Sequence, residues 1–233
     1  MYFKQAVIIL LFAILVYFSV SSFRYSKIWK DSNTMWTHVV KLEPNYSIAY
    51  KSMGYWHAHD KNDFQEALID YNKSIQLNNK DVDAFIGRGN VYGFTGKLDL
   101  ALADFTCAIS IDSMNVSALF NRAITYSNLN KFSNALTDIN KAIHLSSTNT
   151  DYKALKGFVL LQLNKNKECI EVCEDVLSLN ISNPNMYFYE GIAYSQLKNL
   201  NKSLACFTKT LALNKDYPNA EKYHTLVLKE LQK

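Results

Sequence analysis

The chain has 233 residues, of which 48% are hydrophobic, and it contains only 7 glycines and 3 prolines. The apolar content excludes a disordered chain, and the scarcity of turn residues argues against a β-sandwich or an α/β enzyme, so we expect a mostly helical protein. The formal net charge is +4, and the basic residues are spread along the chain among acidic ones. This pattern does not predict a nucleic-acid partner, which usually needs a clustered basic face.

The first element is a hydrophobic run. Residues 5–23 carry no charge, and residues 6–18 are unbroken apolar sequence between Lys4 and Arg24. A helix of this length, at about 1.5 Å per residue, reaches about 28 Å, which is the thickness of a bilayer's hydrocarbon core. We therefore predict one continuous transmembrane helix or signal anchor at 1–23 and a single-pass membrane protein of undetermined orientation. The alternative is a signal peptide cleaved near Ser19-Val20-Ser21, which gives a secreted or periplasmic protein.

A short junction follows at residues 24–46. Asp31 or Ser32 is a suitable cap for a helix that carries apolar residues on one face. That face comprises Trp36, Val39, Val40 and Leu42. The segment ends at Pro44 and fits the second half of a helical hairpin, so we predict a half repeat here.

A repeat of 34 residues occupies the next part of the chain. The sequence from Ala84 matches that from Ala118, and the same period continues to Tyr152 and Met186 and back to Ala49 if one residue is inserted at 60–63. Three columns recur, with small residues in two and mostly large apolar residues in the third: Gly54, Gly89, Ala123, Gly157 and Gly191; Ala67, Ala101, Ala135, Cys169 and Ser203; Tyr71, Phe105, Ile139, Cys173 and Phe207. Each unit is therefore expected to be two antiparallel helices that cross where small residues leave room, and stacked units share one core.

These columns resemble the tetratricopeptide repeat (TPR) family across five repeats at residues 47–217. The resemblance implies an all-α fold, an α-α superhelix of antiparallel helix hairpins, here preceded by one hydrophobic helix. Residues 218–233 would then be a C-terminal capping helix, with Leu226, Leu228 and Leu231 over the open end of the stack. The junction is also similar to that of multi-spanning membrane glycosyltransferases with C-terminal repeats of this type. This second resemblance implies an alternative function as a detached tail or accessory subunit of such an enzyme.

We find no motif that predicts catalysis, a cofactor or a metal site. His57, His59 and Asp60 lie together at a turn, but a metal site needs three or four converging ligands, so we expect a solvated turn. Cys169 and Cys173 are one helical turn apart, and we expect them to be small buried residues and not a disulfide. The chain is therefore predicted to be a non-catalytic scaffold.

The partner-binding surface is expected on the first helix of each repeat, because these helices line the concave face in this architecture. Aromatic and amide side chains prevail there and suit an extended peptide held by stacking and amide hydrogen bonds, although we expect about half of the aromatic rings to be core. The candidate residues are Tyr55, Asn90, Phe94, Phe120, Asn121, Asn128, Phe158 and Phe188. Lys51 matches one lysine of the clamp with which many family members bind a C-terminal carboxylate. The rest of that clamp is replaced by Tyr55, Gly87 and Ser117, so we do not predict it.

Charged residues also recur with the repeat. One column of the second helices carries Asp70, Asp104 and Asp138, and one column of the first helices carries Arg88, Arg122 and Lys156. Pairing each acid with the base 18 residues later leaves no member without a partner. We therefore predict ion pairs between successive repeats; the alternative, pairing within a repeat, joins Arg122 to Asp138.

Overall fold

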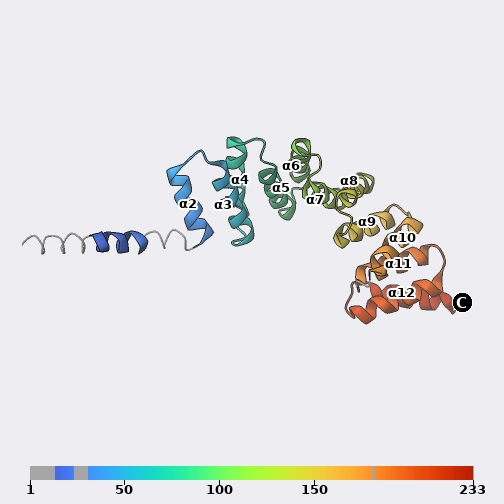
Figure 1. Cartoon of the computed structure of the whole chain (residues 1–233). Helices are drawn as coiled ribbons and strands as arrows, with labels where there is room; N and C mark the ends of the chain where they lie inside the picture. Colours follow the sequence, from blue (N-terminus) through green and yellow to red (C-terminus); the bar gives the residue numbers. More distant parts are fainter. Residues whose placement is uncertain (1–13, 24–30, 180–181, 233) are drawn as a thin grey trace, which may run out of the picture. The chain divides into compact units, whose positions relative to one another are not determined.

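The computed structural model describes residues 14–23, 31–179 and 182–232 (Figure 1). They divide into two compact units, the first ending at Thr95 and the second beginning at Gly96. The regular secondary structure of these residues is α-helical throughout. The predicted all-α class is therefore confirmed.

The first unit holds the helical residues 14–23 and four longer helices, α2 (Ser32–Leu42), α3 (Ser47–His59), α4 (Phe64–Leu77) and α5 (Val82–Phe94). The second unit holds α6 (Leu98–Ile111), α7 (Val116–Asn128), α8 (Phe132–Leu145), α9 (Thr150–Gln162), α10 (Asn166–Ser178), α11 (Pro184–Gln196), α12 (Leu200–Leu213) and α13 (Ala220–Leu231). Short turns join the two helices of a hairpin, for example α3 to α4 and α7 to α8 (Figure 1).

The helix starts follow the predicted period. Helices α6, α8, α10 and α12 begin at residues 98, 132, 166 and 200, which are 34 apart. In the second unit the two helices of a pair begin 16 residues apart, as at 116 and 132, whereas α3 and α4 begin 17 apart, at 47 and 64. The extra residue therefore lies in the turn between α3 and α4, where the sequence comparison predicted an insertion.

The turn inside each hairpin contains one residue in the left-handed backbone region. These residues are 34 apart: Asn62, Gly96, Asn130, Asn164 and Lys198, with φ of 55°, 74°, 57°, 57° and 65°. Glycine and asparagine adopt this conformation readily, whereas a lysine is strained there. This column was not among those predicted from the sequence, although it holds three asparagines and a glycine at a fixed spacing.

The three repeat columns form the core. The fourth residues of the five second helices, from Ala67 to Ser203, are all 0% exposed, and the residues four positions later are at most 2% exposed. Small residues leave room for large ones across each hairpin. A Cβ atom added at Gly191 would lie 2.9 Å from the Phe207 ring, whereas one at Gly157 would lie 3.8 Å from the Cys173 Sγ.

The junction helix forms as α2. It shows which residue is the N-cap, and it corrects one member of the predicted apolar face. Asp31 is the N-cap, because its side chain accepts a hydrogen bond from the Thr34 N–H at 2.8 Å. Trp36 is half-buried as expected, but Leu42 is 69% exposed and does not belong to the packed face. Leu42 is the last residue of the helix, where the chain turns away toward α3.

The last helix, α13, covers the stack with residues other than those predicted. Leu226, Leu228 and Leu231 are 52%, 39% and 38% exposed, so the predicted leucine cap is wrong. Val227 is 2% exposed, and the Tyr223 ring lies 5.7 Å from that of Phe207. Because residues four apart share a helix face, Tyr223 and Val227 face the core together and Leu226 and Leu228 lie to either side. Leu231 follows on the same face as Val227, but it is the last residue of the helix.

The predicted membrane span lies partly outside the described residues, since it covers residues 1–23 and the description begins at residue 14. Residues 14–23 are helical, and Leu15, Tyr17 and Phe18 are 64%, 68% and 61% exposed. Within the described part of the chain, no helix combines the length and the apolar character that a membrane crossing requires.

The predicted pairing between repeats is wrong for Arg122 and Asp138, which were expected to bind Asp104 and Lys156. Arg122 binds Asp138 of its own hairpin with two hydrogen bonds, from Nε to Oδ2 at 2.7 Å and from Nη2 to Oδ1 at 2.8 Å. Asp70 instead lies 2.7 Å from Nδ1 of His57. The antiparallel crossing of α7 and α8 places residues 16 apart side by side, so the spacing of 18 pointed to the wrong neighbour.

Candidate peptide-binding surface

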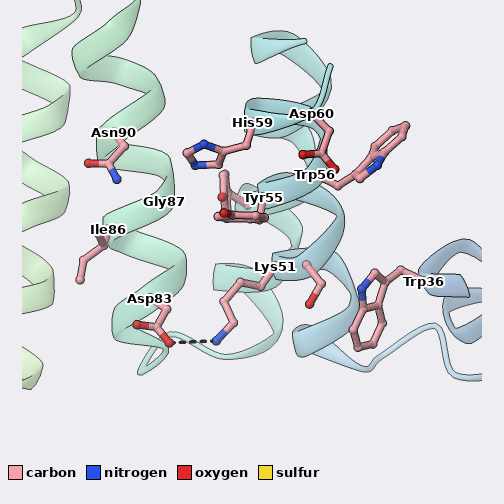
Figure 2. A pocket seen from close by; sticks show the side chains of 12 residues that line it. Trp36, Lys51, Tyr55, Trp56, His59, Asp60, Asp83, Ile86, Gly87 and Asn90 are labelled. Atoms are coloured by element: carbon pink, nitrogen blue, oxygen red, sulfur yellow. Dashed lines mark hydrogen bonds and ion pairs between the residues drawn. The ribbon is translucent and has the colours of Figure 1, made fainter. Parts of the chain in front are cut away.

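One hollow on the predicted groove lies in the first unit and is called here the α3–α5 pocket. It has a volume of about 530 Å³. It is lined by residues of α2, α3, α4 and α5 and by Asp60, which directly follows α3. The residues of the helices are Trp36, Lys51, Ser52, Tyr55, Trp56, His59, Tyr71, Asp83, Ile86, Gly87 and Asn90. Figure 2 shows Tyr55 and His59 reaching from α3 toward Gly87 and Asn90 of α5. Two of the predicted binding residues, Tyr55 and Asn90, therefore meet at one site.

A buried ring from α4 shapes this pocket. Tyr71 is 2% exposed, and its ring lies against both neighbouring first helices at their glycines. A Cβ atom at Gly87 would lie 2.5 Å from that ring, and one at Gly54 would lie 3.1 Å from it. Burial raises the pKa of the Tyr71 hydroxyl, which therefore stays protonated. The glycine at position 87 thus leaves room for the Tyr71 ring, with which any larger side chain there would clash.

The lysine of the pocket is already neutralised. Lys51 Nζ lies 3.0 Å from Asp81 and 3.3 Å from Asp83, and Figure 2 shows the second contact. Burial lowers the pKa of Lys51, but the hydrogen bonds and charges of the two aspartates outweigh that effect and raise it above its ordinary value. Lys51 therefore stays charged, and its charge is neutralised by Asp81 and Asp83.

A smaller hollow of about 170 Å³ adjoins the α3–α5 pocket and shares His59, Gly87 and Asn90 with it. Phe94, another predicted binding residue, lines this hollow and is 75% exposed. Its ring stacks on Phe64, with centroids 6.2 Å apart and planes inclined by 8°. Aromatic surface is therefore presented next to the larger pocket.

The second unit has its own hollow of about 400 Å³, lined by residues of α9 and α11 and of the turn before α13. Phe158 borders it and is half-buried. Phe188 borders it too but is only 9% exposed, and its ring packs 4.8 Å from Tyr217 and 5.7 Å from Phe207. Phe188 is therefore chiefly a core residue.

The remaining predicted residues lie on α7. The Phe120 ring is half-buried and lies 4.6 Å from that of Tyr152, while Asn121 is half-buried and Asn128 is exposed. Sequence reasoning missed the contribution of Trp36 and Tyr71 to the α3–α5 pocket, because it counted only the first helix of each repeat.

The reactive side chains named in the sequence do not converge. His57 points to Asp70, whereas the His59 ring lies 4.3 Å from that of Tyr55. Among the described residues no cluster of three or more metal-ligating side chains occurs. The prediction for Cys169 and Cys173 is confirmed, because both are buried free thiols. Burial also raises the pKa of Cys206 to about 12, which keeps that thiol protonated.

Comparison with known proteins supports the repeat assignment. The family model for the tetratricopeptide repeat matches residues 116–149, which cover α7 and α8. No curated protein matches the chain.

Similar folds occur among solved structures. YrrB, described as a TPR protein with an unusual peptide-binding site, is 20% identical with a TM-score of 0.73, over 80% of this chain and 96% of that one. The MamA protein is 20% identical with a TM-score of 0.67, over 76% and 94% of the two chains. PilF of Pseudomonas aeruginosa is 16% identical with a TM-score of 0.67, over 80% and 84%.

At these identities the structural similarity shows the fold alone, and it does not bear on the resemblance of residues 24–46 to membrane glycosyltransferases. The sequence match and the structural similarity agree on the repeat itself. Residues 116–149 are thus a tetratricopeptide repeat, and the described chain has the fold of tetratricopeptide repeat proteins.

Proposed function

We propose that this chain is a non-catalytic interaction scaffold that binds an extended segment of a partner protein along the first helices of its repeats. In this proposal the five repeats of residues 47–217 carry the binding surface, residues 24–46 form a half repeat, and residues 218–233 cap the stack. The observation that carries it is the coincidence of the predicted groove residues with hollows. Tyr55 and Asn90 line the α3–α5 pocket, and Phe158 borders the hollow of the second unit.

The chemistry of these hollows favours a peptide. Exposed aromatic rings give large contact area at low entropic cost, and amide side chains can bond the backbone of an extended chain. YrrB, which shares the fold, is described as having a peptide-binding site, which is a precedent in the same architecture.

Panning of the immobilised full chain against a random peptide library tests this function. We expect peptides to be enriched, and a Tyr55→Ser/Phe94→Ser variant to lose at least tenfold in affinity for them. Both side chains are strongly exposed, 58% and 75%, so the variant should keep its helical circular dichroism.

The matched control is Tyr46→Ser/Ile69→Ser, which removes two other exposed apolar side chains of the same unit, 39% and 58% exposed. We expect the control to bind as the natural chain does. Equal losses in the two variants would show that exposed apolar surface binds the peptides without a defined site, which contradicts the proposal.

We also propose that residues 1–23 attach the chain to a membrane. The exposed apolar side chains along the helical residues 14–23 support this, since Leu15, Tyr17 and Phe18 are each more than half exposed. Cell fractionation with an alkaline wash, followed by sequencing of the mature amino terminus, is the test. We expect the chain in the washed membrane pellet with residues 1–23 intact. A mature chain that begins near Ser22 and remains in the supernatant would establish the secreted or periplasmic alternative.

A further inference from the structure

We propose that the α3–α5 pocket takes the side chain of a lysine or arginine from the bound segment. This inference rests on the function proposed above and adds to it the chemical class of one side chain that the partner must offer. The walls of the pocket, its charges and its size all bear on the choice.

Four of the twelve residues that line the pocket carry tryptophan or tyrosine rings. Trp36, Tyr55, Trp56 and Tyr71 contribute rings from α2, α3 and α4. The face of such a ring attracts a cation, and recognition of ammonium groups by several rings together is a common use of this attraction. The pocket shows the effect within its own chain, because Lys61 Nζ lies 5.1 Å from the centroid of the Trp56 ring. Tyr55 is 58% exposed, and its ring packs against that of His59, with centroids 4.3 Å apart.

The charges at the pocket favour a basic group over an acidic one. The positive charge among the lining residues is that of Lys51, which is held by Asp81 at 3.0 Å and by Asp83 at 3.3 Å. Asp60 adds a further carboxylate at the rim. Two carboxylates thus hold Lys51, the Asp83 side chain remains 75% exposed, and Asp60 is a separate carboxylate of the pocket. An incoming carboxylate would meet a neutralised lysine, whereas an incoming cation would meet carboxylates that are incompletely paired.

The dimensions suit a long basic side chain. A volume of about 530 Å³ falls within the range of roughly 300–1,000 Å³ that is usual for small-molecule pockets. Lysine and arginine lay an apolar stem along hydrophobic surface and keep the charged end in a polar place. In this pocket the stem would lie along the rings, and the charged end would reach Asp60 or Asp83.

The test uses the full chain and the peptides recovered by panning. We expect one position of those peptides to be enriched in lysine or arginine. A recovered peptide is then resynthesised with lysine, norleucine or glutamate at that position, and its affinity is measured by fluorescence anisotropy. Norleucine keeps the length of the stem without the charge, and we expect it to bind at least tenfold more weakly than lysine.

Two variants of the protein locate the effect. Tyr55→Leu keeps an apolar side chain but loses the ring, and Asp60→Asn loses the charge. Each should weaken the lysine peptide about threefold to tenfold and leave the norleucine peptide unchanged. Tyr46→Leu and Asp99→Asn, which change an exposed tyrosine and an exposed aspartate outside the pocket, should change neither.

The possible outcomes separate this inference from the proposed function. Peptides that bind with norleucine as tightly as with lysine would show an apolar pocket, and a preference for glutamate would show recognition by Lys51. Either result overturns the inference and leaves the proposed function standing. If no peptide is recovered from any library, the proposed function fails and the inference fails with it.

Discussion

Gly157 and Gly191 hold the same position in successive repeats but face partners of different size. A Cβ atom at Gly157 would lie 3.4 Å from Tyr189 and 3.8 Å from the Cys173 Sγ, which is ordinary van der Waals contact. At Gly191 it would lie 2.9 Å from the Phe207 ring, which is 0% exposed and packs against the rings of Phe188 and Tyr223. Glycine in a helix interior costs about 1 kcal/mol relative to alanine, so the two positions should respond to the same substitution with opposite signs.

We therefore predict that Gly157→Ala raises the free energy of unfolding by about 0.5–1 kcal/mol, because alanine has the higher helix propensity and its Cβ atom clashes with no neighbour. Gly191→Ala should lower it by about 1–3 kcal/mol through overpacking against Phe207. Urea denaturation followed by circular dichroism measures both. Two changes of the same sign would show that helix propensity alone, or crowding alone, governs this column.

Lys198 is the residue of the left-handed turn column that does not suit its backbone, with φ of 65°. Because a side chain costs about 1–2 kcal/mol in that region, we predict that Lys198→Gly stabilises the chain by about 1 kcal/mol. The Lys198–Glu230 ion pair at 3.0 Å is lost as well, but both side chains are well exposed and the pair contributes little.

The control for this prediction is Lys131→Gly, where φ is −87° and glycine relieves no strain. Thermal unfolding of both variants should show a gain for Lys198→Gly and none for Lys131→Gly. A gain in both would mean that the loss of a positive charge, and not the backbone, is responsible.

Between elements, the contact of α7 with α8 includes a half-buried ion pair. The side chains of Arg122 and Asp138 are 17% and 7% exposed, and the hydrogen bond with Asp138 is the first cause of the raised pKa of Arg122. We predict a coupling energy of about 1–3 kcal/mol between Arg122→Met and Asp138→Leu in a double-mutant cycle. Each single variant leaves one charge without its partner, so the double variant should be less destabilised than the sum of the two. Additive losses would show that the pair contributes only through packing.

Across the whole molecule, the hydrophobic and small-residue columns were sufficient to predict the helix period, the inserted residue before Phe64 and the buried positions. They were sufficient because each column meets the same physical requirement in every repeat. Polar partners were harder to predict: Asp138 has bases both 16 residues before it and 18 after it, and only the helix crossing decides between Arg122 and Lys156.

The candidate site was predictable only in part for a similar reason. Tyr55 and Asn90 lie on the first helices and follow from the repeat register, whereas Trp36 and Tyr71 reach the pocket from α2 and α4. The α13 contacts were missed because a run with several leucines does not reveal which face meets the core. Tyr223 and Val227 show that the face was set by the packing of Phe188 and Phe207.

The left-handed turn residues have a consequence for how such a chain can change in length. Excision of residues 130–163 removes 34 positions and joins Leu129 to Asn164, so one left-handed asparagine takes the place of another. As far as the backbone is concerned, the loss or duplication of a unit by unequal recombination leaves the turn intact. The side chains are less interchangeable, because Arg122 would then face Val172 where it now binds Asp138. Gain or loss of a repeat is therefore limited by the partners of a few charged residues and not by the turns.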